Sequence, residues 1–331
     1  MINQTGHFVI SLDYELHWGF FDHKSVDDYK ENLTNVNLVI NKLLELSDAY
    51  NVRLTFSTVG FLFAKNKAEL IKYSPIDKPK YKRQELNPYA IFDEIGDNEA
   101  EDPFHYANSI IQEIKAHKIH EIGTHTFGHY YTLEHGQTLQ DFENDIKSAV
   151  AIAKANEVEV KSIVFPRNMI NRAYLDVCYT HGITSYRGTE KSYTYNVHPV
   201  EGKYHRSLFR LVRLLDSYFN ITGSHTHKLQ PINNGQIINI PSSRFLRAYQ
   251  PKLKFLESLK ISRIKKGMET AAKNKKLYHL WWHPHNFGVN IDENFNNLEN
   301  IFKEYKRLQE KYNFTSETMT SLSGKLHSKS N

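Results

Sequence analysis

The chain of 331 residues has a single cysteine, Cys178, which excludes an internal disulfide and fits a reducing compartment. No run approaches the roughly 18 apolar residues that cross a membrane, so we predict no transmembrane segment. The first four residues carry no basic cluster, and the first apolar run is only a strand long, which argues against a secretory signal peptide. We therefore expect a cytoplasmic protein.

Sequence motifs of nucleotide chemistry are also missing. The chain has no Gly-x-Gly-x-x-Gly pattern and no phosphate-binding loop, which argues against dinucleotide and nucleoside triphosphate chemistry. No basic strip with interleaved aromatic residues stands out, so we expect no nucleic-acid partner. The formal net charge of +5 fits phosphate-bearing substrates, although ordinary proteins carry similar charges. The oligomeric state is not indicated by the sequence.

Short apolar, β-rich runs alternate with helical patterns along the chain. Strands are expected at residues 8–12, 53–58, 119–123, 162–165, 184–186, 236–240 and 277–282. Helices are expected at residues 33–50, 104–117, 139–155, 171–181, 253–274 and 295–312. This alternation predicts an α/β fold, a distorted or incomplete (β/α) barrel of about seven parallel strands.

The alternation of strands and helices is interrupted near residues 74–102 and 190–205. Both segments are too long for routine connections, so each is either a substrate-covering insertion or a decorated surface loop. We expect one domain over residues 1–322, followed by a polar tail at 323–331.

Two histidines, His125 and His129, follow the strand expected at residues 119–123. If the strand runs into a helical turn, residues four apart lie on one face, as two ligands of one metal ion require. The chain holds 18 histidines, so a chance pair at this spacing is the alternative.

Two carboxylates, Asp13 and Glu15, end the first expected strand. Alternate strand residues point the same way, so both carboxylates face one side. Two negative charges this close repel each other and raise the free energy of the folded protein, unless a cation lies nearby or one carboxylate takes up a proton. One carboxylate then serves as a metal ligand and the other as a base, unless the pair only caps a loop.

Two further strand ends carry an arginine and a histidine. Arg167 follows Pro166 at the end of the fourth expected strand, and His283 closes the aromatic strand at residues 277–282. A histidine beside bulky aromatics suits a general acid, although a core histidine and a surface arginine are the alternatives. In parallel α/β folds, functional groups collect at the C-terminal ends of strands, so the coincidence of four such ends indicates an active site.

With these motifs in this order, the chain resembles the polysaccharide deacetylase superfamily (NodB-type carbohydrate esterases) over residues 8–322. The resemblance implies a metal-dependent hydrolase that removes acetyl groups from amino sugars. It assigns Asp13 as the base, Arg167 as the residue that orients it, His283 as the acid, and Glu15, His125 and His129 as metal ligands.

The chain departs from the usual family motifs in three ways. Asp-Tyr-Glu replaces adjacent aspartates, Arg167 follows its proline instead of preceding it, and the late histidine is paired with His285. These features resemble a divergent branch that acts on small or lipid-linked sugars. The ligand set predicts a divalent metal, with zinc as the first choice and cobalt, nickel, iron or manganese also compatible.

Several residues are predicted to bind substrate. Trp18 and Trp282 are platforms for a sugar ring or ordinary packing residues, and Arg187 and Arg244 either clamp an anionic group or lie on the surface. His285, past Pro284 in a turn, and the neighbouring Asn286 are expected to contact the substrate.

The expected cytoplasmic location narrows the substrate. It favours a nucleotide- or lipid-linked N-acetylated amino sugar, as in the biosynthesis of surface polysaccharides such as O-antigen, lipopolysaccharide or capsule. Two alternatives remain, another C–N amide hydrolase on the same scaffold and a non-catalytic carbohydrate-binding relative.

Overall fold

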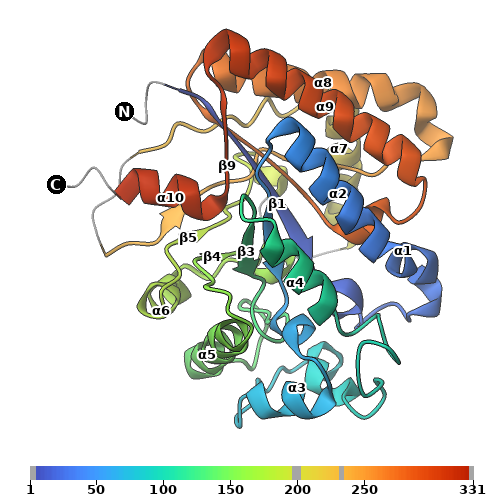
Figure 1. Ribbon diagram of the computed structural model, residues 1–331, viewed down its shortest axis with the longest axis vertical. Helices are drawn as coiled ribbons and strands as arrows, with labels where there is room; N and C mark the ends of the chain where they lie inside the picture. Colours follow the sequence, from blue (N-terminus) through green and yellow to red (C-terminus); the bar gives the residue numbers. More distant parts are fainter. Residues whose placement is uncertain (1–4, 196–202, 231–234, 328–331) are drawn as a thin grey trace.

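Parallel strands form one nine-stranded sheet in the computed structural model, which describes residues 5–195, 203–230 and 235–327 (Figure 1). Eight strands follow the order β6-β5-β4-β3-β2-β1-β8-β7, and β9 pairs with the start of β1. Their bounds are β1 His7–Tyr14, β2 Thr55–Thr58, β3 Glu121–Thr124, β4 Ser162–Ile163, β5 Ser185–Tyr186, β6 Ile238–Asn239, β7 Arg244–Phe245, β8 Leu277–Trp282 and β9 Thr315–Glu317.

The two ends of the sheet are joined by one short segment of chain. β6 pairs with β5, and a few residues later β7 pairs with β8. Between them, Ser242 N donates to Gly188 O at 2.8 Å and Ser243 N donates to His279 O at 2.7 Å. The sheet therefore curls into the predicted barrel-like α/β fold.

All seven expected strands are present, with ends that differ by up to two residues. β7 and β9 were not predicted, because each is only two or three residues long and lies in a mostly polar stretch of sequence. A strand this short has no period-2 pattern of its own and is defined by its neighbours in the sheet.

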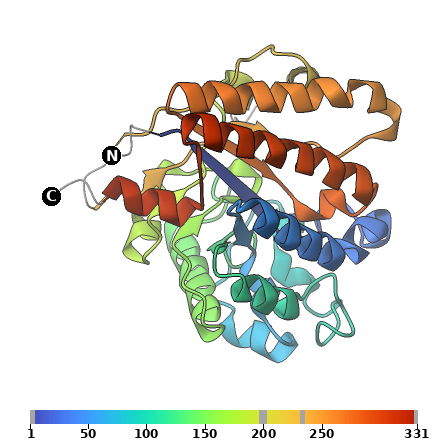
Figure 2. The same ribbon diagram turned by 45° about the horizontal axis from the view of Figure 1, so that its top comes forward.

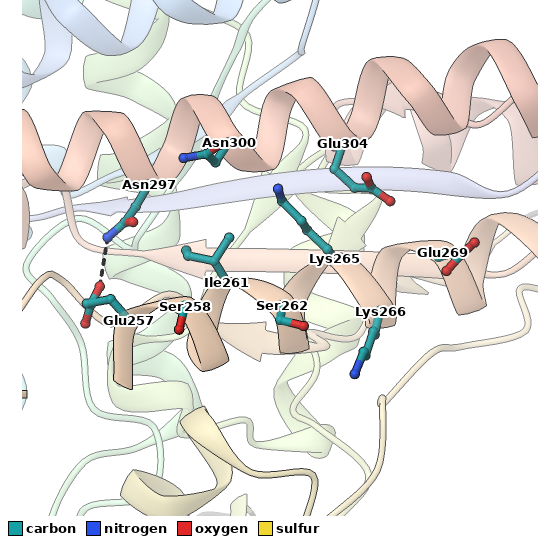
Figure 3. A pocket seen from close by; sticks show the side chains of 10 residues that line it. All are labelled: Glu257, Ser258, Ile261, Ser262, Lys265, Lys266, Glu269, Asn297, Asn300 and Glu304. Atoms are coloured by element: carbon teal, nitrogen blue, oxygen red, sulfur yellow. Dashed lines mark hydrogen bonds between the residues drawn. The ribbon is translucent and has the colours of Figure 1, made fainter. Parts of the chain in front are cut away.

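Helices surround the sheet on the outside (Figures 1 and 2). They are α1 Lys30–Thr34, α2 Val36–Tyr50, α3 Lys67–Tyr73, α4 Asn108–Ala116, α5 Leu139–Ala155, α6 Leu175–Thr180, α7 Lys203–Tyr218, α8 Glu257–Lys273, α9 Ile291–Tyr312 and α10 Met319–His327. A groove of about 500 Å³ between α8 and α9 is lined by residues of these two helices alone (Figure 3). It is therefore separate from the strand ends.

Strand residues alternate between the helical layer and the barrel interior, as the period of two requires. On β1, Phe8, Ile10 and Leu12 pack in the large core beneath the helices, whereas Val9 packs with Leu277 in a smaller cluster. The same alternation along β1 and β8 decides which of their side chains reach the site.

The C-terminal segment is a packed helix, so the predicted polar tail is wrong for residues 323–327. In α10, Met319, Leu322 and Leu326 are buried against Val9 and Leu277. Because these side chains recur three and four residues apart, they form one apolar helix face. Residues 328–331 lie outside the described part of the chain.

No helix among the described residues has the length and apolar character to cross a membrane.

Candidate metal and catalytic site

Asp13 lies at the end of β1 with both carboxylate oxygens engaged. Arg187 Nη1 donates to Oδ1 at 2.7 Å and Nη2 donates to Oδ2 at 2.8 Å, a bidentate pair. Burial is the largest single effect and raises the pKa of Asp13, but the charge and hydrogen bonds of Arg187, together with His125 and His283, more than offset it, so the pKa lies below its usual value. Asp13 is therefore ionised at neutral pH.

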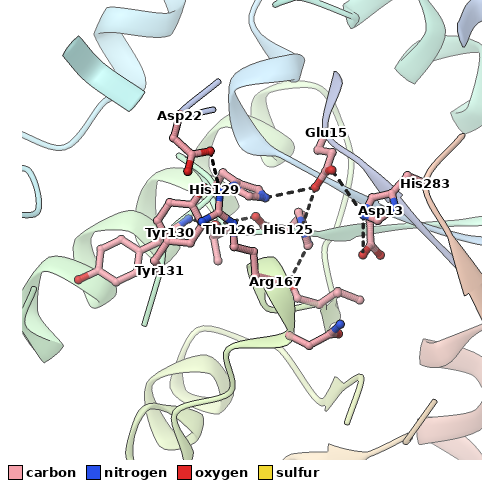
Figure 4. A network of polar contacts seen from close by, with 12 residues as sticks. Asp13, Glu15, Asp22, His125, Thr126, His129, Tyr130, Tyr131, Arg167 and His283 are labelled. Carbon is pink, nitrogen blue, oxygen red and sulfur yellow. Dashed lines mark hydrogen bonds and ion pairs between the residues drawn. The ribbon is translucent and has the colours of Figure 1, made fainter. Parts of the chain in front are cut away.

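Glu15 is the point on which three histidines converge (Figure 4). Its Oε2 lies 3.3 Å from His125 Nε2 and 3.2 Å from His129 Nε2, and its Oε1 lies 3.4 Å from His283 Nε2. Burial raises the pKa of Glu15, but the charge of His283 and the close contacts of the His125 and His129 rings outweigh it, so the pKa lies well below its usual value.

The chemistry of Glu15, His125 and His129 fits a bound divalent cation. Their ligand atoms all lie within 4.8 Å of one another. His125 Nδ1 donates to Val164 O at 2.8 Å, so in the neutral ring Nε2 carries a lone pair, and it makes no hydrogen bond within the described residues. That lone pair faces a carboxylate oxygen, and a cation satisfies both. Burial lowers the pKa of His129 to about 4, which keeps this ring neutral as well.

The turn that carries the two histidines is not the helical turn that the spacing suggested. Thr126 and His129 have left-handed φ values of 65° and 52°. Asp145 of α5 fixes the turn, because its carboxylate accepts from Phe127 N at 2.7 Å and Gly128 N at 2.9 Å. The two imidazoles thus meet at Glu15 through an irregular turn, which explains why helical spacing predicted the convergence but not its backbone.

Left-handed residues other than glycine gather around the site. Leu16 has a φ of 46°, and Arg167 and Asn168 both have a φ of 53°, in addition to the two residues of the histidine turn. Such conformations cost on the order of 1–3 kcal/mol each and persist only where the surroundings hold them. Their concentration at three strand ends is typical of a functional site.

The structure does not bring Arg167 to Asp13, so that expected contact is wrong. Arg167 Nη2 donates to Asp22 at 2.6 Å, and its guanidinium lies 4.5 Å from the Tyr131 ring centroid. The partner of Asp13 is Arg187, which follows β5. Arg187 therefore binds a carboxylate of the protein itself. It neither lies on the surface nor is free to bind an anionic group of a substrate.

His283 occupies the opposite side of Glu15 from the metal-ligand pair. Its Nε2 is 3.8 Å from Asp13 Oδ2. Asn286 Nδ2 lies 3.3 Å from His283 Nδ1, and Tyr29 Oη donates to Asn286 Oδ1 at 3.0 Å. Asn286 therefore orients His283, a role that differs from the substrate contact expected for it.

His285 is buried instead of exposed in the turn that follows β8. Its ring stacks on His283 with centroids 5.1 Å apart and meets Phe20 and Tyr29 edge-on. Burial lowers the pKa of His285 to about 3, so the ring is neutral. The structure places it behind His283, away from a direct contact with substrate.

The predicted aromatic platforms are packing residues. Trp18 and Trp282 are both fully buried, with Trp18 against Phe61 and Trp282 stacked on Phe287. Trp281 instead lines a cavity of about 250 Å³ together with His283. Residues two apart on a strand share a face, so the position of His283 already indicated Trp281 and not Trp282.

Arg244 lies at the wall of the same cavity, but its charge is neutralised inside the protein. Its Nη1 donates to Asp216 Oδ2 at 3.0 Å, and Arg263 holds the other oxygen of that carboxylate at 2.7 Å. Arg244 was expected either to lie on the surface or to bind an anionic group of the substrate. The structure shows instead that it forms a buried ion pair.

A chain of hydrogen bonds connects the loop after β1 to the end of the insertion at residues 74–102. Asp102 Oδ2 lies 2.7 Å from His105 Nδ1, His105 Nε2 lies 2.8 Å from His17 Nδ1, and His17 Nε2 lies 2.9 Å from Lys24 O. The insertion also supplies Tyr81, whose hydroxyl accepts from the backbone beside His129. It therefore supports the loops of the site. For the second insertion, residues 196–202 lie outside the described part of the chain.

Gly19 is a residue of the site that the motifs did not reveal. A Cβ at this position would lie 2.1 Å from Glu15 Cδ and Oε1. Any side chain there would displace the carboxylate on which the histidines converge.

Solved structures of very different sequence share this architecture. A protein from Mycobacterium smegmatis described as a polysaccharide deacetylase has a TM-score of 0.60 at 10% identity, over 98% of this chain and 91% of that one. The chain has the polysaccharide deacetylase fold. A structure from Pseudomonas aeruginosa PAO1 that is also described as a polysaccharide deacetylase gives a TM-score of 0.53 at 11% identity, and Puue allantoinase gives 0.54 at 10%, each over 98% of this chain and 91% of the other.

Comparison by sequence adds nothing to this relationship, because no family model and no curated protein matches the chain. The resemblance drawn from the motifs is therefore confirmed for the polysaccharide deacetylase fold. The chemical roles of the individual residues rest on the geometry described above.

Proposed function

We propose that the protein is a metal-dependent hydrolase that removes the acetyl group from an N-acetylated amino sugar. The observation that carries this proposal is the arrangement around Glu15. A carboxylate and two imidazoles that suit a cation lie between Asp13 on one strand end and His283 on another. Amide hydrolysis needs a base for water and an acid for the departing amine, and these two residues supply them.

Glu15, His125 and His129 would hold the divalent cation. Bound there, it would polarise the acetamide carbonyl and lower the pKa of the attacking water. Asp13 accepts the proton of that water, because Arg187 keeps the carboxylate ionised and its plane fixed. Arg187 is itself held by Ser11 Oγ at 2.9 Å and Asn168 Oδ1 at 3.1 Å, so the base cannot turn away.

His283 donates a proton to the nitrogen of the departing amine. Its ring is fixed by Asn286 at Nδ1, so Nε2 points at the carboxylates of the site. Its side chain is 24% exposed and lines the cavity of about 250 Å³. Trp281 and Phe245 line that cavity, with ring centroids 4.7 Å apart, and offer apolar surface to a pyranose.

The test is acetate release from a panel of N-acetylated amino sugars, with metal content measured on the same preparation. We expect acetate in amounts that follow the bound metal, and none from Asp13→Asn. Asp27→Asn is the matched control, because Asp27 is an exposed carboxylate outside the site. Hydrolysis of a cyclic amide without acetate release would indicate another C–N hydrolase, and sugar binding without turnover would indicate a non-catalytic relative.

A further inference from the structure

The cavity beside His283 carries an excess of positive charge. Four arginines (Arg167, Arg213, Arg244 and Arg247) and one glutamate (Glu190) are among its lining residues. Arg167 and Arg244 have carboxylate partners, Asp22 and Asp216. Within the described residues, Arg213 and Arg247 form no ion pair.

Arg247 is poorly compensated for a cation in its surroundings. Its side chain is only partly exposed, and Nε donates to Ser217 Oγ at 2.7 Å, which leaves the terminal nitrogens without a hydrogen bond inside the described part of the chain. Burial lowers the pKa of Arg247, and the nearby charge of Arg213 acts in the same direction. Two neighbouring cations at one cavity, without a counter-ion, raise the free energy of the protein until an anion binds.

The carboxylate at this cavity does not compensate the two cations. Glu190 is buried, and its Oε1 accepts from Trp281 Nε1 at 3.2 Å, so it fixes the indole instead of pairing with an arginine. The cavity is therefore lined by His283 and three aromatic side chains, Tyr195, Phe245 and Trp281, and also by a pair of uncompensated guanidinium groups.

We propose that Arg213 and Arg247 form an anion subsite that binds the phosphoryl group through which the amino sugar is attached to its carrier. This inference rests on the proposed deacetylation and names the substrate class of the same site. A planar guanidinium donates two parallel hydrogen bonds to phosphate oxygens, which makes arginine the natural residue for such a group. The sugar would lie along Trp281 and Phe245 with its acetamido group at His283.

A phosphoryl group on a sugar is supplied either by a nucleoside diphosphate or by a polyprenyl phosphate. The shared chemistry is a phosphate ester at the anomeric carbon. The two sources are distinguished by comparing a nucleoside-diphosphate N-acetylamino sugar with the same sugar on polyprenyl diphosphate. The carrier with the higher kcat/KM is the source.

The experiment measures acetate release from N-acetylglucosamine and from its 1-phosphate. Two charge-assisted hydrogen bonds predict that wild type prefers the phosphate by at least about tenfold in kcat/KM. The double variant R213Q/R247Q should lose that preference. Arg210→Gln is the matched control, because Arg210 lies on the same helix, is exposed and does not line the cavity. If the double variant does not fold, as judged by circular dichroism, R247Q alone is compared with R247K, which keeps the charge.

Binding of N-acetylglucosamine 1-phosphate, followed by calorimetry, gives a readout independent of turnover. Binding that weakens with salt and is lost in R213Q/R247Q supports the subsite even if no acetate is released, in which case the deacetylase proposal alone fails. Equal kcat/KM for the free and phosphorylated sugars, or a preference that survives in R213Q/R247Q, overturns the subsite and leaves the deacetylase proposal in place.

Discussion

Replacing Arg187 by methionine tests whether the base depends on its buried partner. Both oxygens of Asp13 accept from Arg187, and the two side chains are at most 5% exposed. Removing one member of a buried ion pair leaves the other charge uncompensated and costs about 3–5 kcal/mol. Because a domain is stable by only about 5–15 kcal/mol, we expect a large loss in the free energy of unfolding, measured by urea denaturation.

The pH dependence of this loss gives a second measurement. In the wild type, the lowered pKa of Asp13 contributes stability that is present above pH 3.8, the usual pKa of the group, and is lost as the pH falls through the folded-state value. In Arg187→Met both effects of Arg187 are gone and burial is the largest effect that remains, so the pKa of Asp13 is raised and acid stabilises the folded state. The difference in stability between the two proteins should therefore narrow from pH 7 towards pH 4.

The double variant R187M/D13N separates charge from packing. It removes both members of the pair, so it should recover much of the stability lost in Arg187→Met while remaining inactive. A cost below about 1 kcal/mol for Arg187→Met, the range of an exposed pair, together with unchanged turnover, would refute the reasoning.

Four further predictions concern the same site. His125→Ala and Glu15→Ala should each lose most of the bound metal by elemental analysis, and full metal in either variant would remove that residue as a ligand. Asp13→Asn should keep the metal and lose turnover, whereas metal loss would make Asp13 a ligand. His283→Ala should slow hydrolysis of a basic acetamido sugar by about 10²–10⁴-fold but affect an activated anilide far less, and equal losses would exclude it as the acid. Burial raises the pKa of Asp145 to about 7, so this group lowers stability as the pH rises from about 4 to 7, and Asp145→Asn should flatten that slope in urea titrations.

The elements of the fold were predictable where the sequence pattern was long enough to define them. Helix α5 was predicted with its observed ends because its apolar residues recur at helical spacing, and β1 and β8 were both expected because each is a continuous apolar run. Helix α7 was missed, although its leucines recur at helical spacing, because it begins within the segment interpreted as an insertion.

The candidate site was predictable in its local motifs and not in its long-range partners. Asp13, Glu15, His125, His129 and His283 were all expected from strand ends, and the structure brings them together. The arginine on Asp13 was assigned to the wrong strand end, because only the curvature of the sheet shows that β5 faces β1 across the barrel interior. Trp282 was predicted to face the substrate, but residues two apart on a strand share a face, so Trp281 lies on the same face as His283 and Trp282 does not.

The hydrogen-bond chain from Asp102 through His105 and His17 to the Lys24 carbonyl carries an odd number of protons. Its three links in series require three protons, because both terminal groups are acceptors, whereas two neutral imidazoles supply only two. One ring in the intact chain is therefore an imidazolium. Loss of the third proton breaks one link, although the loop that follows Glu15 keeps the hydrogen bonds from His17 N to Phe104 O at 3.2 Å and from Trp18 Nε1 to His105 O at 2.9 Å.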